Sequence, residues 1–222
     1  MNAPLKTIKQ AEALIENAVW QALENEDHGA ELESYEEVQR MLQTLADLSA
    51  DVQREHDRVM AYCLMRINDA RTRLDEKSDE ELLKESLRLA ERSGDEVQTA
   101  RSTLSMGIHL LNSGQLPEAE DHLGRVFDLA EGMEDSRDMQ QVVGWTLIVR
   151  ANILLGKSLY GQAKRVAEDA ISTLGAIDNY AGLRVAYRIL ASVYRSLGTE
   201  KEAGECMRMA EEYENLAKTH HS

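Results

Sequence analysis

The fold is decided by the stretch from Asp178 to Ala217, DNYAGLRVAYRILASVYRSLGTEKEAGECMRMAEEYENLA. Its first half places apolar residues at helical spacing, and Gly198 then ends the run at a position that favours a left-handed backbone. Thr199 opens the second half, and Glu202 completes a capping box, in which two side chains satisfy amides at a helix start. The small residues Ala203 and Ala210 give the second helix a thin apolar seam. The stretch therefore predicts a helical hairpin that needs neighbours of the same kind.

The same pattern recurs upstream with a regular period. Gly114, Gly156 and Gly198 each close the first helix of a pair, and successive glycines are 42 residues apart. The triplet Leu-Ala-Glu at residues 89–91 returns at residues 129–131, a step of 40. A two-helix repeat of this length is typical of a solenoid, which is stabilised between neighbouring repeats rather than around one centre.

Composition agrees with an all-α solenoid of about five hairpins. The chain contains only two prolines, and aromatic residues make up 5% of it, while 43% of its residues are hydrophobic. Long helices are therefore permitted almost everywhere, and strand-forming residues are few. The predicted helices begin near Leu5, near Ser34 and near Asp51, then after Ser78, and continue as pairs over 96–132, 136–174 and 178–217. Capping boxes are predicted at Ser34 with Glu37 and at Ser78 with Glu81.

Charge divides the chain into three predicted parts. Residues 1–50 contain ten acidic and three basic side chains and form an acidic N-terminal helical hairpin. It is either an end cap of the array, with a polar outer face, or a self-association surface that forms a homodimer through Leu5, Ile8 and Ile15. Residues 51–218 form the helical repeat array, and residues 219–222 form a tail.

The overall charge and the cysteines limit the class of partner and the location. The formal net charge of −15 repels phosphate backbones and anionic membrane surfaces, so neither nucleic acid nor a membrane is expected as a partner. No apolar run approaches a membrane span, and the N-terminus lacks the apolar core of a signal peptide. Cys63 and Cys206 lie far apart and are expected to be free, buried thiols. These features predict a cytoplasmic protein.

The chain resembles the tetratricopeptide repeat (TPR) family, in particular its longer, loosely spaced bacterial regulatory type. The family pattern of a large residue, a leucine, a small residue and a tyrosine, followed by a small residue and an alanine, is met in part in three copies. The matching residues are Met106, Gly107, Leu110, Gly114 and Ala119; then Trp145, Ile148 and Gly156, with Val149 and Asn152 departing from the pattern; and finally Tyr187, Leu190, Ala191, Tyr194, Gly198 and Ala203.

This resemblance implies a right-handed superhelix in which the first helix of each pair lines a concave groove for a peptide or helix of another protein. Arginines recur on the corresponding faces of the first helices, and guanidinium groups pair bidentately with carboxylates and phosphates. The alternative is that these arginines are solvated or paired with acids of neighbouring helices. The candidate binding residues are Asn68, Arg71, Arg101, Asn112, Arg150, Arg184, Arg188, Ser192 and Arg195.

Two functional hypotheses follow, and both are non-enzymatic. The first is a protein-interaction module, an adaptor that binds an acidic peptide or helix in the arginine-lined groove. The second is a sensory or regulatory domain that controls an output domain in response to a small anionic ligand or peptide. No phosphate-binding loop, nucleophile elbow or metal-ligand spacing occurs in the sequence, so no catalytic residue, metal or cofactor is expected. A third class, a repeat enzyme acting on nucleic acid, would need a large basic face.

Overall fold

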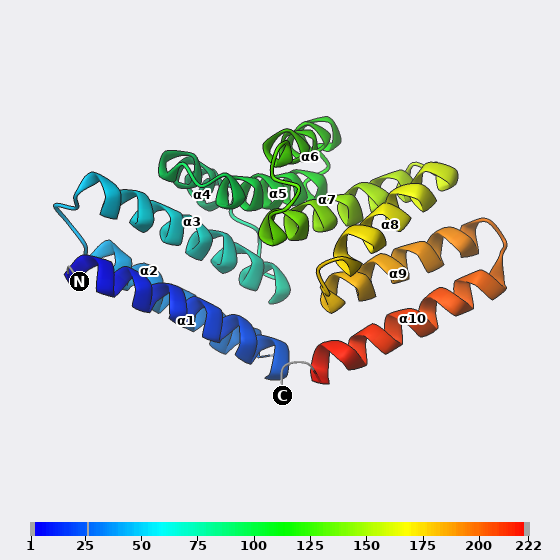
Figure 1. The fold of residues 1–222 in the computed structure, drawn as a ribbon, viewed down its shortest axis with the longest axis horizontal. Coiled ribbons are helices and arrows are strands. Elements are labelled where there is room, and N and C mark those ends of the chain that lie inside the picture. Colours follow the sequence, from blue (N-terminus) through cyan, green and yellow to red (C-terminus); the bar gives the residue numbers. More distant parts are fainter. Residues whose placement is uncertain (1–2, 26, 220–222) are drawn as a thin grey trace. The chain divides into compact units, whose positions relative to one another are not determined.

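The computed structural model describes residues 3–25 and 27–219, and the side chains of all of these except residues 20 and 22–25. This part of the chain contains ten α-helices and no strand, which confirms the predicted all-α class (Figure 1). Residues 220–222 of the predicted tail lie outside the described residues. The helices are α1 (Ala3–Asn25), α2 (His28–Gln43), α3 (Ala50–Arg73), α4 (Glu80–Ser93), α5 (Glu96–Asn112), α6 (Leu116–Ala130), α7 (Arg137–Gly156), α8 (Tyr160–Gly175), α9 (Tyr180–Ser196) and α10 (Glu200–Thr219).

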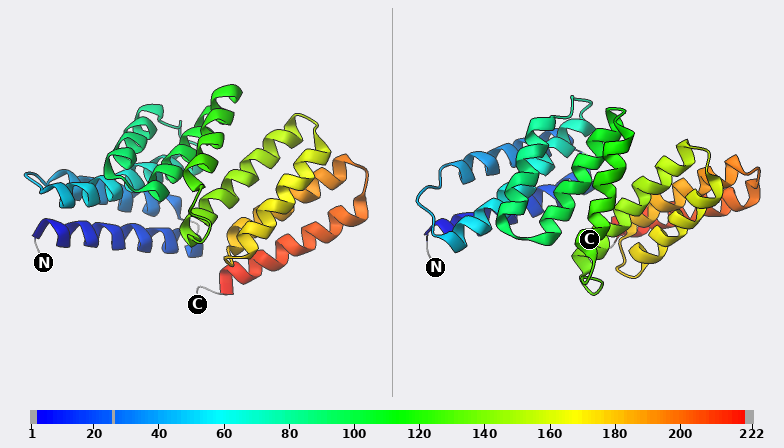
Figure 2. Two further views of the ribbon diagram at one scale, coloured as in Figure 1. Left: turned by 45° about the horizontal axis from the view of Figure 1, so that its top comes forward. Right: turned by 90° about the horizontal axis from the view of Figure 1, so that it is seen from above.

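Two compact units make up the chain, Met1–Ala119 and Glu120–Ser222. In the first unit, α1 packs on α2 and α3, and α3 packs on α4 and α5 (Figure 2). Ile8 and Ile15 of α1 are almost fully buried in the core that these helices share with Tyr35. The acidic hairpin is thus an integral part of the first unit. Ile8 and Ile15 are not on the surface, which corrects their assignment to a self-association face.

The second unit is built from the hairpins α7–α8 and α9–α10. Leu174, near the end of α8, is fully buried between two helices that each present a glycine to it. A Cβ added to Gly144 of α7 would lie 2.5 Å from Leu174 Cδ2, and one added to Gly182 of α9 would lie 2.9 Å from Leu174 Cδ1. Glycine is favoured at Gly144 because a Cβ there would force the Leu174 side chain to move. Leu174 of α8 therefore packs directly against both α7 and α9.

The first helices of the pairs end in the same backbone motif. After α3, α5, α7 and α9, a residue with positive φ donates its N–H to the carbonyl three residues earlier, and the next N–H bonds five residues back. This is the Schellman motif, which uses carbonyls that the helix leaves free. The positive-φ residues are Asp75, Gly114, Ser158 and Gly198.

The structure changes the repeat register that the glycines suggest. Gly156 is the last residue of α7, and Ser158 has the left-handed backbone, with φ 59°. The structurally equivalent residues are Gly114, Ser158 and Gly198, which are 44 and 40 residues apart. The two equal steps of 42 arise when Gly156, which is helical, is counted in place of Ser158. The solenoid prediction is unaffected, because α3, α5, α7 and α9 still end in the same way.

The assignment of the left-handed position to Ser158 rather than Gly156 can be tested by substitution. Ser158→Gly should raise the free energy of unfolding by about 1 kcal/mol, because glycine adopts positive φ without the Cβ clash. Gly156→Ala should also raise it, by about 0.5 to 1 kcal/mol, because this position is helical and a Cβ there meets nothing within 4 Å. Gly198→Ala, at a true left-handed position, should lower it by about 1 kcal/mol. Urea unfolding followed by circular dichroism measures all three, and a loss of stability in Gly156→Ala would contradict the register.

Two predicted capping boxes are wrong, and a third position uses its hydroxyl differently. The helix α2 starts at His28, capped by Asp27, whose carboxylate accepts from the Ala30 amide, so Ser34 lies inside the helix. At α4 the cap is Asp79, which accepts from the amides of Glu81 and Leu82. Thr199 donates its hydroxyl to the Tyr194 carbonyl at 3.1 Å. The hydroxyls of Ser34 and Ser78 likewise donate to other acceptors, the Ala30 carbonyl and Asn68 Oδ1.

Candidate functional site

The predicted binding residues of α3 are engaged in holding the first unit together. Asn68 is buried, and its Oδ1 accepts from the Ser78 hydroxyl and from the Asp79 amide, both at 2.9 Å. Arg71 donates to Glu36 Oε1 of α2 at 3.1 Å. Asn68 therefore fixes the loop before α4, and Arg71 ties α3 to α2.

The two predicted residues of α5 lie in different surroundings. The guanidinium carbon of Arg101 lies 5.5 Å from the centre of the Tyr62 ring of α3, a cation–π contact. Asn112 is exposed in the last turn of α5. Neither arrangement brings Arg101 and Asn112 together with the residues of α3 into one open site.

A stripe of arginines on α9, predicted from the sequence, is present on one face of that helix. We name Arg188, Ser192 and Arg195 the α9 stripe; Arg188 and Arg195 are exposed, and Ser192 donates its hydroxyl to the Arg188 carbonyl at 3.0 Å. Neither guanidinium has an ion pair or hydrogen bond within the described residues. Arg184 precedes the stripe by one turn and lies 3.9 Å from Glu214 of α10. Its Nε is buried and finds no hydrogen-bond acceptor in the described part of the chain.

Arg150 of α7 points to a different surface from the α9 stripe. Its guanidinium carbon lies 5.8 Å from the centre of the Phe127 ring of α6. It also lines a cleft of about 500 Å³ with residues of α8, among them Arg165. Sequence reasoning missed Phe127 and Arg165, since their proximity to Arg150 depends on how α6 and α8 pack.

Several arginines of the first unit, in contrast, pair with buried acids. Glu31 of α2 has no exposed side-chain surface and is the centre of one cluster. Its two oxygens accept from Tyr35 at 2.8 Å, from Arg66 at 2.9 Å and from Arg73 at 2.6 Å. Burial by itself raises the pKa of Glu31, but the Tyr35 hydrogen bond and the two guanidinium groups lower it below its ordinary value.

Asp57 of α3 is the centre of a second buried cluster. It accepts from Gln53 of its own helix at 2.8 Å, and both of its oxygens accept from the guanidinium of Arg92 of α4. Burial raises the pKa of Asp57, but the hydrogen bonds from Arg92, Gln53 and His56 lower it overall. Because one partner of each cluster is buried, the clusters are structural rather than available to a ligand.

These two clusters predict acid sensitivity of the first unit. A carboxylate whose pKa is lower in the folded state stabilises the fold above its unfolded pKa, and this contribution is lost as the pH falls through the folded value. The ordinary values are 4.5 for Glu31 and 3.8 for Asp57. Urea midpoints should therefore stay constant from about pH 7 to 5 and fall below about pH 4.5. Glu31→Gln should flatten this fall, and an unchanged pH profile in that variant would contradict the assignment.

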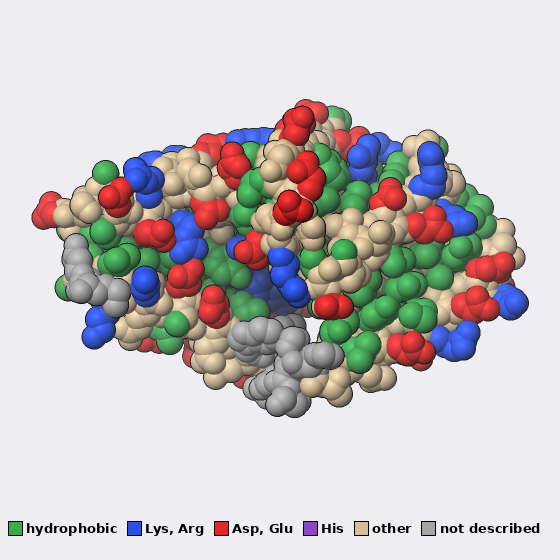
Figure 3. Space-filling model, in the orientation of Figure 1, with side chains coloured by type: hydrophobic (Ala, Val, Ile, Leu, Met, Phe, Trp, Pro, Cys, Tyr) green, Lys and Arg blue, Asp and Glu red, His purple; other side chains and the backbone are tan. Residues whose placement is uncertain are grey.

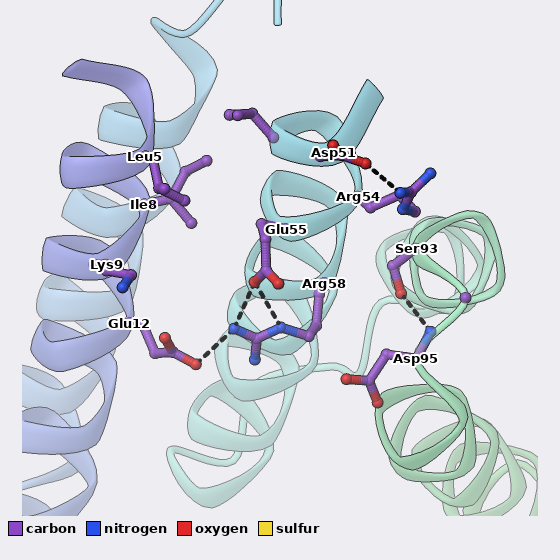
Figure 4. Close-up of a pocket in the computed structure, with 12 residues that line it drawn as sticks. Leu5, Ile8, Lys9, Glu12, Asp51, Arg54, Glu55, Arg58, Ser93 and Asp95 are labelled. Atoms are coloured by element: carbon purple, nitrogen blue, oxygen red, sulfur yellow. Dashed lines mark hydrogen bonds and ion pairs between the residues drawn. The ribbon is translucent and has the colours of Figure 1, made fainter. Parts of the chain in front are cut away.

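The first unit also holds a cleft of about 630 Å³ between α1, α3 and the α4–α5 turn (Figure 4). Arg58 of α3 crosses it and donates to Glu12 of α1 at 2.8 Å and to Glu55 at 3.0 Å. Arg54 pairs with Asp51 at its edge. The arginines of this cleft are thus matched by its own acids, which leaves little affinity for a charged ligand.

The formal charge also differs between the two units. The sequence of the first unit has 24 acidic and 13 basic side chains, a balance of −11, while the second has 16 and 12, a balance of −4. Figure 3 shows acidic and basic side chains interspersed over α1–α3, and hydrophobic side chains gathered over α9 and α10. The acidic excess is therefore smaller in the unit that carries the α9 stripe.

The described residues also bear on metal and membrane sites. No helix among them is long and apolar enough to cross a membrane. Within the same residues, no group of three or more His, Cys, Asp or Glu side chains is placed to hold a metal ion. Cys63 and Cys206 are free and buried, as predicted.

The fold defines the class of protein as a TPR-like helical repeat protein. No protein-family model matches the sequence, and no curated protein matches it. Several solved structures, however, align with this chain. Aspartyl phosphate phosphatase F from Bacillus subtilis aligns with a TM-score of 0.66 and 14% identity, over 98% of this chain and 54% of that one. This chain thus spans about half the length of the phosphatase.

Two further structures align over nearly the whole of both chains. BtubC from P. vanneervenii gives a TM-score of 0.56 and 16% identity, over 99% of this chain and 94% of that one. TPR-like repeats of a kinesin light chain from Podosopora anserina give 0.58 and 13%, over 99% and 100%. At these identities the likeness is one of fold, and it confirms the TPR-like resemblance.

Proposed function

We propose that this protein is a non-enzymatic interaction module that binds an acidic peptide or helix of a partner protein on the α9 stripe. The observation that carries the proposal is the exposure of Arg188 and Arg195 together with their lack of an acidic partner in the part of the chain that the structure describes. Both are exposed and lack an acidic partner within the described residues, in a chain whose formal charge is −15. The first unit, by comparison, pairs Arg58, Arg66 and Arg92 with its own acids. An exposed, unpaired guanidinium keeps all its donors for a carboxylate.

The stripe itself defines the ligand. Arg188 and Arg195 share one helix face, whereas the exposed Leu197 is two positions after Arg195 and lies on another side of the helix. The stripe therefore selects the acidic face of a segment, and the apolar face of that segment is not recognised by it. Of the nine candidate residues, the proposal therefore keeps Arg188, Ser192 and Arg195. It sets aside Asn68 and Arg71, whose side chains are bound within the fold, and Arg184, which lies near Glu214.

The test uses a fluorescent amphipathic 16-residue peptide of Leu and Glu and its Glu→Gln counterpart. The wild-type chain should bind the acidic peptide more tightly, by at least about tenfold. Arg188→Glu with Arg195→Glu should abolish this preference, because two attractive charges become repulsive. Fluorescence anisotropy at physiological ionic strength measures both.

The matched control carries the same charge change on another helix. Lys201→Glu with Arg208→Glu alters two exposed basic residues of α10. It should leave the preference for the acidic peptide within about threefold of wild type, the size of a long-range charge effect. If both double variants lose binding equally, the effect is one of net charge, and the α9 stripe is not the binding site.

A further inference from the structure

A second surface of the Glu120–Ser222 unit has the opposite charge preference. The hairpin α7–α8 carries a stripe of cleft-lining residues, spaced by three or four positions along α8 and by four, seven and four positions along α7. On α7 the stripe contains Met139, Val143, Arg150 and Leu154, and on α8 it contains Gln162, Val166, Asp169, Thr173 and Ala176. Two separate clefts lie along it, one bounded by the end of α6 and the other by α7 and α8. We name the cleft at the end of α6 the methionine cleft.

The methionine cleft has a volume of about 580 Å³ and an apolar floor. Met139 is only 1% exposed at its base, and Phe127, Met133 and Val143 are half-buried around it. Methionine side chains are flexible and polarisable, so they adapt to the shape of an inserted apolar group. The floor can therefore receive a large apolar side chain from outside.

The rim of the methionine cleft is acidic. Asp128, Glu131 and Glu134 line it, and all three are exposed. Glu134 accepts from the Gly132 amide at 3.1 Å, whereas the carboxylates of Asp128 and Glu131 have no partner within the described residues. Two arginines lie close to this cleft, and both are engaged: Arg137 donates to the carbonyl of Ile177, next to the cleft residue Ala176, and Arg150 lies over Phe127 and lines the neighbouring cleft. Unpaired carboxylates around an apolar floor favour an occupant that is apolar in the centre and positively charged at its edge.

We propose that the methionine cleft binds a basic amphipathic helix of a partner protein. Its apolar face lies on Phe127, Met133 and Val143, and lysine or arginine side chains flanking that face pair with Asp128 and Glu131. An amphipathic helix fits because it presents an apolar face flanked by charged side chains, which matches the apolar floor and the acidic rim of the cleft. The neighbouring cleft contains both Arg150 and Arg165 and the acids Glu168 and Asp169, so it accepts the next turn of the helix with either charge.

The experiment uses the full chain and a 16-residue Leu/Lys peptide with helical amphipathic periodicity, carrying a fluorophore and one photo-reactive leucine. The wild-type chain should bind it about tenfold or more tightly than a scrambled peptide of the same composition, because both carry equal charge but only one has an apolar face. Photo-crosslinks should fall in residues 127–143. Equal binding of the scrambled peptide, or crosslinks on another surface, would overturn the proposal.

Two variants and a control separate charge from packing. Asp128→Asn with Glu131→Gln should weaken binding about fivefold, the value for two exposed ion pairs. Val143→Asp should weaken it about tenfold or more, because it buries a carboxylate under an apolar face. Glu211→Gln with Glu212→Gln, on exposed positions of α10, should change affinity less than about twofold.

The result is independent of the α9 stripe. Arg188→Glu with Arg195→Glu should leave crosslinking of the Leu/Lys peptide at residues 127–143 unchanged, whereas the methionine-cleft variants should leave the acidic-peptide preference unchanged. If the chain alone forms a dimer that Val143→Asp dissociates, the occupant is a second copy of this chain, and the proposal of a basic partner helix is overturned.

Discussion

Replacing Glu31 with alanine should lower the free energy of unfolding by about 3 to 5 kcal/mol, the loss typical of breaking a buried ion pair. The carboxylate is fully buried and accepts from Tyr35, Arg66 and Arg73. Its removal leaves the Tyr35 hydroxyl without its acceptor and takes the closest carboxylate from Arg73 and from Arg66, which is only 16% exposed and keeps Tyr35 at 3.2 Å and Asp69 at 3.7 Å. Desolvated cations without a counter-charge are costly. Urea unfolding followed by circular dichroism measures the loss.

The control is an ion pair of similar chemistry on the surface. Glu81 of α4 pairs with Lys84 at 2.8 Å, and its side chain is 82% exposed. Glu81→Ala should cost less than about 0.5 kcal/mol, because water replaces the lost partner. Glu31→Gln should be intermediate, since it keeps an oxygen for the Tyr35 hydroxyl but removes the charge. If Glu31→Ala costs no more than Glu81→Ala, Arg66 and Arg73 reach water in the folded state, and the cluster contributes no stability.

Replacing Leu174 with alanine should lower the free energy of unfolding by about 2 to 5 kcal/mol, because a fully buried leucine leaves a cavity between three helices. The reciprocal change, Gly144→Ala, should cost about 1 to 3 kcal/mol, because its Cβ would lie 2.5 Å from two carbon atoms of Leu174. Gly204→Ala on α10 is the control. A Cβ there meets nothing within 4 Å, so helix propensity alone should raise stability by up to about 1 kcal/mol.

The double variant of Gly144→Ala with Leu174→Ala tests whether the two residues act on each other. The methyl group added on α7 fills part of the space that Leu174 leaves, so the double variant should be more stable than the sum of the single losses by at least about 1 kcal/mol. Strict additivity would mean that α7 and α8 move apart in Gly144→Ala and that Leu174 does not fix their distance. Denaturant unfolding of the four chains gives the coupling free energy.

The helices could be predicted from the sequence because their signals are local. Apolar spacing and the scarcity of proline identified the pairs, and Gly114 and Gly198 marked true left-handed ends. Gly156 misled the register because a glycine near a helix end resembles a cap, whereas Ser158 adopts positive φ without being glycine. The serine-based caps at Ser34 and Ser78 failed for a related reason, since Asp27 and Asp79, equally good caps, precede the helices α2 and α4.

Residues of the candidate site could be predicted from the sequence only where their neighbours belong to the same helix. Arg188 and Arg195 have no acidic residue three or four positions away on either side, and the structure leaves both unpaired within the residues it describes. Arg71 and Asn68 could not be excluded as binding residues, because their partners Glu36 and Ser78 depend on how α2, α3 and the loop before α4 pack. The methionine cleft likewise requires α6 beside the α7–α8 hairpin, which no spacing within one helix indicates.

The Schellman ends of the first helices bear on how this architecture changes over time. Their hydrogen bonds join backbone N–H and carbonyl groups only, so the turns prescribe a backbone shape rather than particular side chains. Aspartate, serine and glycine all occupy the left-handed position, and the positions themselves are 39, 44 and 40 residues apart. Helices can therefore lengthen or shorten between turns, and the residues at the turns can drift, without loss of the hairpin. Such an array keeps its three-dimensional period after its sequence period has faded, which explains a fold shared at 13–16% identity with proteins that no sequence model connects to it.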